Sequence, residues 1–381
     1  IMKMILKNLK KKEDLSKLLP LLEAERANIK DKQTELKKEY PPYLFNLSNL
    51  QGYITSKYKG WTSDKVLKVA QSLYEKKLTT YPRTASVVLE ESLKDRAKKV
   101  LETLKVGLPY EGEIKFTTSK RIFDSSKVES HSAITPTYIK PSGLNGDEKI
   151  VYEAIKNRFI MQFMPVAEFE ETKVTLKAEN PEIKGIFISK GKVKLVEGWK
   201  KVEKIESKDV ILPKVEVNEN VDVIKSKVSS VTKKPPKHHT EKTLLRVMET
   251  CGKGVEGKED SEEMMASILS GFSIGTPATR AETIKKLKDI GYLKTKGKSL
   301  ICTDLGRNIV EIFPVKDLLD LEYTGRLEKT LSDIEKGKFE KNDFMNLIKD
   351  FTIKSVDAIK SDTGALSRFK VELPKDVESV G

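Results

Sequence analysis

Residues 80–86 place a phenol, a guanidinium and two hydroxyl groups close together on the chain. The proline after Tyr81 biases that residue toward an extended backbone, so the phenol should project from an irregular segment that follows a helix. Arg83 comes two residues later, and its planar fork suits a phosphate better than an ammonium group does. Thr84 and Ser86 add hydroxyl donors. An attacking oxygen beside a cation is what nucleophilic attack on a phosphodiester requires, so we predict that chemistry here.

The alternative for the same residues is a packed tyrosine at a helix end, followed by a surface arginine. The Tyr-Pro-Arg triplet by itself favours that alternative, so the nucleophile prediction depends on further motifs. A free phenol has a pKa near 10, and its proton must therefore be removed during attack at neutral pH. An arginine cannot act as the base because its guanidinium stays protonated.

A second candidate phosphate site lies at the predicted start of a helix. Thr276 and Pro277 are typical of a helix N-terminus. Free amides in a first helical turn attract anions, and Thr279 and Arg280 stand beside them. The lysine-rich residues 293–299 should form a basic two-stranded wing after this helix. The alternative is an ordinary winged-helix-like fold with a solvated wing.

Stretches of different hydrophobic pattern must position these residues, and the length of the chain is enough for more than one domain. Within the β-rich stretch, residues 189–192 are predicted to be a turn between two short strands, and residues 218–220 a second hairpin turn. The loop at residues 252–263 and the tail are predicted to be loosely ordered. The stretches are a charged helix and a polar strand in 1–40, helices in 46–163, strands in 165–235, helices from 240, and the tail 361–381.

The composition suits a folded nucleic-acid-binding protein. Over 381 residues, 71 basic side chains against 57 acidic ones give a net charge of +14, which attracts phosphates. A generally lysine-rich composition is the alternative explanation for this charge. Cys251 and Cys302 alone can form neither a zinc site nor a disulfide framework, and they suit a reducing cytoplasm. The sequence contains no apolar stretch of the roughly 20 residues that a membrane helix needs.

Four ordered blocks give the strongest indication. Residues 42–84, with the sequences Pro-Tyr-Leu-Phe-Asn-Leu-Ser-Asn-Leu-Gln, Ala-Gln-Ser-Leu-Tyr-Glu and Tyr-Pro-Arg-Thr, resemble the segment that leads to the nucleophile in type IA DNA topoisomerases, especially the topoisomerase III branch. Residues 131–137 resemble the family's His-x-Ala-Ile-x-Pro-Thr motif. Residues 235–245 resemble its Pro-Pro-x-x-x-Thr-Glu-x-x-Leu element, and residues 275–281 its Gly-x-Pro-x-Thr-x-Ala turn. The resemblance extends over about residues 5 to 355.

The resemblance implies roles for individual residues. Tyr81, Arg83 and His131 would be catalytic, with His131 contacting the scissile or an adjacent phosphate, although a lone histidine of this kind is more often structural. His238 and His239 are assigned to backbone contact or to plain structure. The residues expected to contact DNA are Thr84, Ser86, Thr240, Thr276, Thr279 and Arg280.

The resemblance also implies a cofactor. Type IA enzymes bind Mg²⁺ through the acids of a Toprim domain, but no Asp-x-Asp pair occurs in this sequence. We therefore expect a fragment that lacks the Toprim domain, contains no metal ligands and is catalytically incompetent alone. If the chain were active alone, acids such as Glu259, Asp260, Glu262 and Glu263 would be its metal ligands. Ala85 stands where the family usually has aspartate, which puts a local hydrogen bond near the nucleophile in doubt.

The family architecture implies a multidomain α+β fold and an expected layout. Residues 1–40 and 165–239 would form a β-rich arch around a hole, 41–164 the helical domain with the nucleophile, 240–360 a winged-helix-like groove for single-stranded DNA, and 361–381 a tail. The enzyme would cleave one DNA strand through a 5′-phosphotyrosine, pass a strand and reseal the break without ATP. Single-stranded and underwound duplex DNA are the expected partners. We expect a monomer that acts in the cytoplasm on nucleoid or mobile-element DNA and not on a membrane.

Two other functions compete with this interpretation. The first is a non-catalytic single-stranded DNA-binding protein derived from the same family. The gene sequence upstream of this chain would distinguish it from a truncated enzyme. The second is a tyrosine recombinase or type IB enzyme, which also combines tyrosine, arginine and histidine. Those enzymes normally carry the tyrosine near the end of the catalytic domain, whereas Tyr81 is early in the chain, and they form 3′ linkages.

Overall fold

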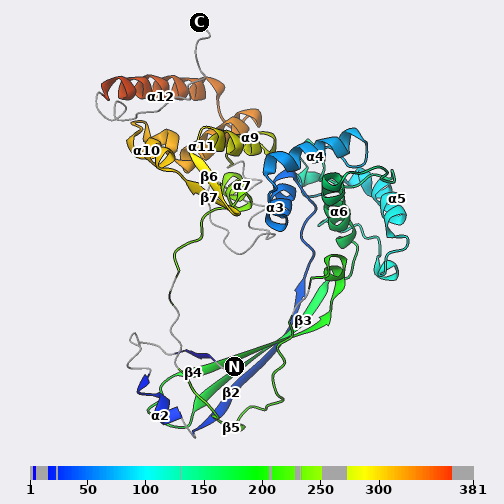
Figure 1. Cartoon of the computed structure of the whole chain (residues 1–381), viewed down its shortest axis with the longest axis vertical. Helices are drawn as coiled ribbons and strands as arrows, with labels where there is room; N and C mark the ends of the chain where they lie inside the picture. The colour runs from blue at the N-terminus through cyan, green and yellow to red at the C-terminus, as the bar shows by residue number, and fades with distance from the viewer. Residues whose placement is uncertain are drawn as a thin grey trace. The chain divides into compact units, whose positions relative to one another are not determined.

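The computed structural model describes residues 3–5, 16–22, 25–128, 130–205, 208–227, 232, 234–250 and 273–362. Contacts divide the chain into two compact units, which we describe separately (Figure 1). Helices and strands are mixed along the chain, so the predicted α+β class is confirmed, while the arch and its hole stay a prediction. The predicted loop at 252–263 and the tail from 363 onward lie outside the described residues. Unit 1 comprises Ile1–Pro42, Lys105–Thr117 and Ile160–Pro236, and unit 2 comprises Tyr43–Leu104, Thr118–Phe159 and Lys237–Gly381.

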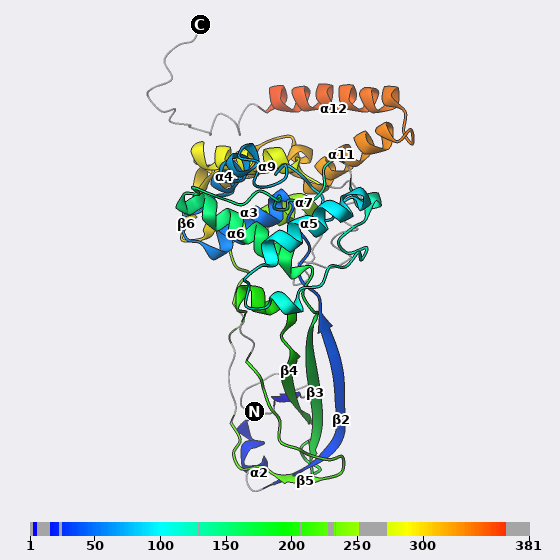
Figure 2. The ribbon, with the colours of Figure 1, turned by 90° about the vertical axis from the view of Figure 1, so that its right-hand side faces the viewer.

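Unit 1 is built on a five-stranded antiparallel sheet with the order β1-β4-β3-β2-β5. β2 and β3 lie side by side along most of their length, from Ala27 opposite Ala178 to Glu39 opposite Ala167 (Figure 2). The charged sequence of β2 fits this position because most of its second half is exposed. The strands are β1 (Lys3–Ile5), β2 (Arg26–Glu39), β3 (Ala167–Ala178), β4 (Ile186–Val196) and β5 (Asn220–Asp222), and the short helix α2 (Leu19–Leu22) precedes β2.

The turn predicted at residues 189–192 is wrong, because β4 runs through it without interruption. Gly191 lies in mid-strand opposite Thr172. A side chain at this glycine would put its Cβ 2.9 Å from Leu212 Cγ and 3.0 Å from the Val210 carbonyl oxygen. The glycine therefore marks a close approach of another segment to the strand and not a turn.

The second predicted hairpin is correct in its turn and wrong in its partner. Asn218 has a φ of +71°, which an asparagine tolerates in a tight turn. The residues after it form β5, which pairs with β2 and not with the segment that precedes the turn. The Ile29 carbonyl accepts the Asn218 N–H at 2.8 Å, so contacts with β2 replace a local hairpin.

The first part of unit 2 is a helical core. Its helices are α3 (Leu47–Lys57), α4 (Ser63–Glu75), α5 (Lys94–Lys105, whose last residue falls in unit 1) and α6 (Gly146–Met161). Asn46 caps α3 by accepting the Asn49 N–H at 2.8 Å. Thr62 caps α4 by accepting the Lys65 N–H at 3.2 Å. Buried apolar side chains of α3, α4 and α6 pack together, among them Leu50, Ile54, Val66, Leu73, Val151 and Ile155.

The second part of unit 2 contains α7 (Glu241–Thr250), α9 (Pro277–Asp289), α10 (Asp304–Ile312), α11 (Leu321–Glu335) and α12 (Lys341–Ser361). α9 begins at Pro277, as predicted, and Gly291 follows its end with a φ of +89°. The predicted wing is confirmed as the antiparallel pair β6 (Leu293–Lys296) and β7 (Ser299–Cys302). Leu245 and Met248 of α7 pack against Ile284 of α9 and join the wing to the helices.

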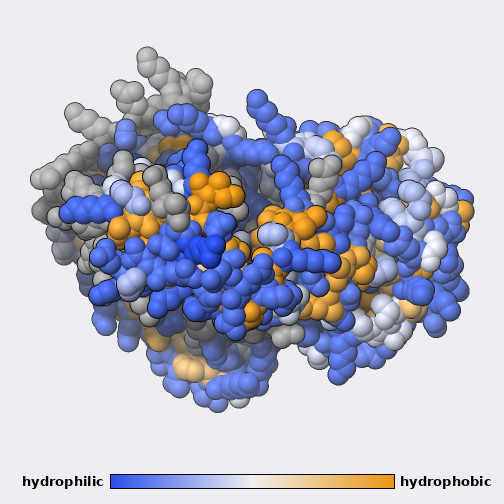
Figure 3. Space-filling model, turned by 90° about the horizontal axis from the view of Figure 1, so that it is seen from below, coloured by the Kyte–Doolittle hydropathy of each residue, from blue (hydrophilic) through white to orange (hydrophobic). Residues whose placement is uncertain are grey.

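The surface reflects the high content of charged residues, which is 34%. On the face seen in Figure 3, hydrophilic residues predominate and hydrophobic residues form separate patches. Over the described ranges, no helix is both long enough and apolar enough to cross a membrane.

Candidate active site

The segment that carries Tyr81 is bonded to the segment that carries His131. The Thr80 N–H donates to the Thr135 carbonyl at 2.9 Å, and the Thr80 hydroxyl accepts the Thr135 N–H at the same distance. The Thr137 N–H donates to the Leu78 carbonyl at 3.0 Å. Two motifs that are distant in the sequence thus lie side by side.

The Tyr81 ring lies between two other rings. Its centroid is 5.4 Å from that of Tyr74, which belongs to α4, and 4.7 Å from that of His131. Tyr81 is partly buried and His131 is exposed. The ring contacts fix the direction of the phenol, while none of the described residues hydrogen-bonds its hydroxyl oxygen. The structure therefore brings two of the three predicted catalytic residues into contact.

Thr84 and Ser86 are buried, and their hydroxyl groups bond to the protein backbone. The Thr84 hydroxyl donates to the His131 carbonyl at 2.7 Å and accepts the Ser86 N–H at 3.0 Å. The Ser86 hydroxyl donates to the Val88 carbonyl at 3.0 Å. Both side chains thus support the segment from inside, and Thr84 ties the segment that carries Tyr81 to the backbone of His131.

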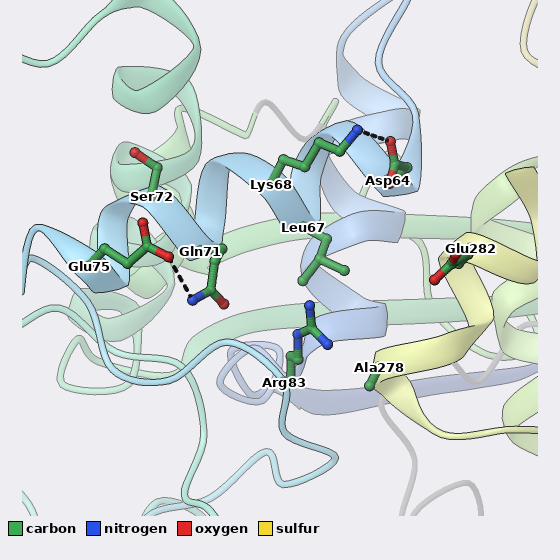
Figure 4. A pocket seen from close by; sticks show the side chains of 9 residues that line it. All are labelled: Asp64, Leu67, Lys68, Gln71, Ser72, Glu75, Arg83, Ala278 and Glu282. Atoms are coloured by element: carbon green, nitrogen blue, oxygen red, sulfur yellow. Dashed lines mark hydrogen bonds and ion pairs between the residues drawn. The ribbon is translucent and has the colours of Figure 1, made fainter.

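Arg83 lines a cleft of about 290 Å³ between α4 and α9 (Figure 4). Its exposed guanidinium is directed toward Leu67 and Ala278. Two interactions within the cleft occupy polar side chains of α4, an Asp64–Lys68 ion pair at 3.0 Å and a Gln71–Glu75 hydrogen bond at 3.1 Å. Arg83 itself makes no hydrogen bond or ion pair with any described residue, so its charge is available to a ligand.

The first turn of α9 borders the same cleft through Ala278. Thr276 and Thr279, on either side of Ala278 in the sequence, are exposed. The Thr276 N–H donates to the Thr279 hydroxyl at 3.1 Å, which closes the turn. The helix turn that carries these two predicted DNA-contacting residues therefore borders the cleft that Arg83 lines.

Thr240 is placed differently, at the start of α7. Its hydroxyl accepts the Thr243 N–H at 3.3 Å, and its own N–H donates to the Thr243 hydroxyl at 2.8 Å. This reciprocal pair is a capping arrangement, so the side chain stabilises the helix start. His239 contacts the same Thr243 hydroxyl through Nδ1 at 3.1 Å.

Arg280, also predicted to contact DNA, is only 4% exposed. Its Nε donates to the Ile274 carbonyl at 2.9 Å and its Nη2 to the Gly275 carbonyl at 2.8 Å. Nη1 lies 3.4 Å from both Ser48 Oγ and Glu249 Oε1. The guanidinium is directed into the protein and presents almost no surface to a phosphate.

Comparison with known proteins decides the family. A family model described as DNA topoisomerase matches residues 3–346. DNA topoisomerase 3 of Bacillus licheniformis is 32% identical in an alignment 363 residues long, which covers 91% of this chain and 49% of that protein. The chain belongs to the type IA DNA topoisomerase family.

Further type IA relatives agree with this assignment. DNA topoisomerase 3 of Staphylococcus aureus strain USA300 is 31% identical in an alignment 360 residues long, which covers 92% of this chain and 49% of the relative. The structure of full-length topoisomerase I from Thermotoga maritima matches with a TM-score of 0.68 at 25% identity, and the match covers 96% of this chain and 57% of that one. The chain spans about half the length of the curated relatives it matches.

Two contacts that support the candidate site were not singled out from the sequence. The Asn46 side-chain amide donates to the Ala85 carbonyl at 3.1 Å, and the Leu47 N–H donates to the Thr84 carbonyl at 3.2 Å. Residues 46 and 47 belong to the family block that leads to the nucleophile, which was the available signal. Glu249 lies in none of the quoted motifs, so no signal indicated its contact with Arg280.

The described residues do not fit a metal site for the topoisomerase reaction. Among them, no group of three or more histidine, cysteine, aspartate or glutamate side chains is placed to hold a metal ion. The four acids considered above as alternative ligands, Glu259, Asp260, Glu262 and Glu263, lie outside the described residues. We therefore derive no step through Mg²⁺.

Proposed function

We propose that this chain supplies the nucleophile and part of the DNA-binding surface of a type IA DNA topoisomerase that cleaves one DNA strand, allows strand passage and reseals the break without ATP. The observation that carries the proposal is the arrangement around Tyr81. Its phenol is held against His131, and the guanidinium of Arg83, which no described residue pairs with, is two residues away in the sequence. Membership of the family supports the same reaction.

In the proposed reaction, the Tyr81 oxygen attacks the phosphorus of a DNA phosphodiester. A bond forms between that oxygen and phosphorus, and the bond from phosphorus to the 3′-oxygen breaks. The phenol loses a proton and the departing 3′-oxygen gains one, so the products are a 5′-phosphotyrosine and a 3′-hydroxyl. The reverse attack by the 3′-hydroxyl reseals the strand, and the phosphotyrosine linkage conserves the bond energy, which makes ATP unnecessary.

Arg83 would offset the charge that develops on the non-bridging phosphate oxygens. His131 would donate a hydrogen bond to the scissile or an adjacent phosphate, which its exposure on one side of the Tyr81 ring supports. Thr276 and Thr279 would bind a neighbouring phosphate at the start of α9, where helix amides favour anions. For Thr84 and Ser86, whose hydroxyls bond to the backbone, and for the capping residue Thr240, we propose positioning in place of DNA contact.

The remaining features of the proposal concern the whole enzyme. Its substrates would be single-stranded and underwound duplex DNA, and it would act as a monomer in the cytoplasm on nucleoid or mobile-element DNA. The Mg²⁺ ligands would come from a Toprim domain. We retain the division into two arch segments (1–40 and 165–239), a nucleophile domain (41–164), a DNA groove domain (240–360) and a tail (361–381) as part of this proposal.

The test is a cleavage assay on the enzyme that contains this chain, with oligonucleotides labelled at the 5′ or the 3′ end. After denaturation, the 3′-labelled DNA should remain attached to the protein and the 5′-labelled DNA should be released. Tyr81→Phe should abolish the adduct while single-stranded DNA binding stays within a few-fold. An adduct that carries the 5′-labelled DNA through a 3′-phosphate, or one that persists in Tyr81→Phe, would refute the proposal.

A further inference from the structure

The turn before α9 is closed by the side chain of Arg280, one turn into the helix. This side chain donates to the two carbonyls that precede Thr276, those of Ile274 and Gly275. Gly275 has a φ of +61°, and a Cβ there would lie 3.0 Å from the Thr279 hydroxyl. The turn is therefore tight, and the position of Thr276 and Thr279 depends on what Arg280 is attached to.

Arg280 is attached to two other helices. Its Nη1 reaches Ser48 in α3 and Glu249 in α7, both at 3.4 Å. The side chains of Arg280 and Glu249 are each 5% exposed, and burial raises the pKa of the Glu249 carboxyl, while Arg280 and Ser48 act in the opposite direction. A buried charge without a partner is costly, so these groups hold one another in a defined arrangement.

The same turn of α3 holds the nucleophile segment. Asn46 and Leu47 bind the carbonyls of Ala85 and Thr84, and Ser48 is the next residue. Three consecutive residues, the cap Asn46 and the first two residues of α3, thus connect the segment that carries Tyr81 with the helix start that carries Thr276 and Thr279. Arg83 and Ala278, one from each of these two parts, line the same cleft.

We propose that Ser48, Glu249 and Arg280 are positioning residues that fix the first turn of α9 relative to the Tyr81 segment, so that phosphate contacts at Thr276 and Thr279 align the DNA strand for attack. The inference rests on the proposed function. A misplacement of about 1 Å in such an arrangement costs ~100-fold in rate, whereas DNA bound through many phosphates loses little affinity.

A positioning role differs measurably from a direct DNA contact by Arg280. Loss of one phosphate contact weakens single-stranded DNA binding and reduces the log–log salt slope by about 0.7. Loss of positioning slows cleavage and leaves the salt slope unchanged.

The experiment uses the enzyme that contains this chain and compares Arg280→Lys and Ser48→Ala with the control Lys288→Gln. Lys288 lies in the last turn of α9 and forms a 2.6 Å ion pair with the buried Glu241, so the control breaks a comparable bond at the other end of the helix. Each variant is measured for thermal unfolding, single-stranded DNA affinity at several salt concentrations and single-turnover cleavage of a labelled oligonucleotide.

We expect Arg280→Lys to cleave ~10–100-fold more slowly, with the dissociation constant within about threefold and the salt slope unchanged. Ser48→Ala should also slow cleavage, by a smaller factor, and it tests the inference if Arg280→Lys does not fold. Lys288→Gln should cleave within about threefold of the wild type at a similar cost in stability. Cleavage by both cluster variants that matches the control, or a loss of single-stranded DNA affinity as large as the loss of cleavage in both of them, would overturn the inference. If the wild type forms no adduct, the proposed function fails, and the inference fails with it.

Discussion

Tyr81 and Arg83 are two residues apart and have different surroundings. The tyrosine ring packs between Tyr74 and His131, whereas the arginine lies in the cleft toward α9. The side chain that would attack is therefore held by ring contacts, and the side chain that would bind phosphate is left without a protein partner among the described residues. A test of Arg83 should therefore change the shape of its head group and keep its positive charge.

Arg83→Lys should keep the charge and lose the two-pronged contact with a phosphate. We expect single-turnover cleavage to fall by ~10–1000-fold, which corresponds to about 1.4–4 kcal/mol of transition-state stabilisation. Lys68→Gln is the matched control because Lys68 lines the same cleft but is already paired with Asp64. Equal cleavage by Arg83→Lys and the wild type would exclude the bidentate role.

At the scale of elements, α4 and α6 are joined by a carboxylate. Glu148, at the start of α6, accepts hydrogen bonds from Lys76 at 2.6 Å and Ser72 at 2.7 Å. The hydrogen bond from Lys76 contributes most to a lowered pKa of the Glu148 carboxyl. The bonds from Ser72 and from the Asn145 N–H also lower it, whereas burial of the carboxyl acts in the opposite direction. The ionised carboxylate is therefore favoured in the folded state.

This lowered pKa predicts a pH dependence of stability. Because the folded-state pKa lies below the unfolded value of about 4.3, the stabilisation is complete above that value and is lost as the pH falls through the folded pKa. Glu148→Gln should cost about 1–3 kcal/mol at pH 7 and much less at pH 3. Urea unfolding of both proteins between pH 3 and pH 7 measures the difference. A difference that does not change with pH would contradict the assignment.

An element can be predicted from the sequence when the residues that determine its structure belong to the element itself. The start of α9 and the wing were predictable because threonine, proline and glycine act on their own backbone. Gly191 was read as a turn because Val210 and Leu212, which explain it, approach from outside the strand pair. The inward direction of Arg280 could not be predicted either, since Glu249 lies in no motif and Ser48 is 232 residues away.

At the scale of the whole molecule, the net charge of +14 governs encounters with nucleic acid. The family assignment required several motifs in order, while charge alone left a lysine-rich composition as an alternative. Positive charge raises the rate and affinity of binding to any polyanion, so salt dependence is the property that reports it.

This chain should bind single-stranded DNA more tightly than blunt duplex, with affinity that falls steeply as salt rises. For about four phosphate contacts the slope of log affinity against log salt should be near −3, at ~0.7 per contact. Fluorescence anisotropy with a labelled oligonucleotide between 50 and 300 mM salt would measure it. A flat response, or tighter binding of the duplex, would contradict the DNA groove prediction.

The contact between Ser48 and Arg280 has a consequence for the time course of synthesis. The helices α3, α4 and α6 share a core that needs only the first 160 or so residues, but Ser48 and Arg280 are 232 residues apart. At about 5–20 residues per second, a ribosome completes Arg280 roughly 10–50 s after Ser48. During this interval Ser48 lacks its arginine partner, and the Tyr81 segment is held without a connection to α9. The nascent chain therefore contains the proposed nucleophile well before it contains the turn that would align DNA with it.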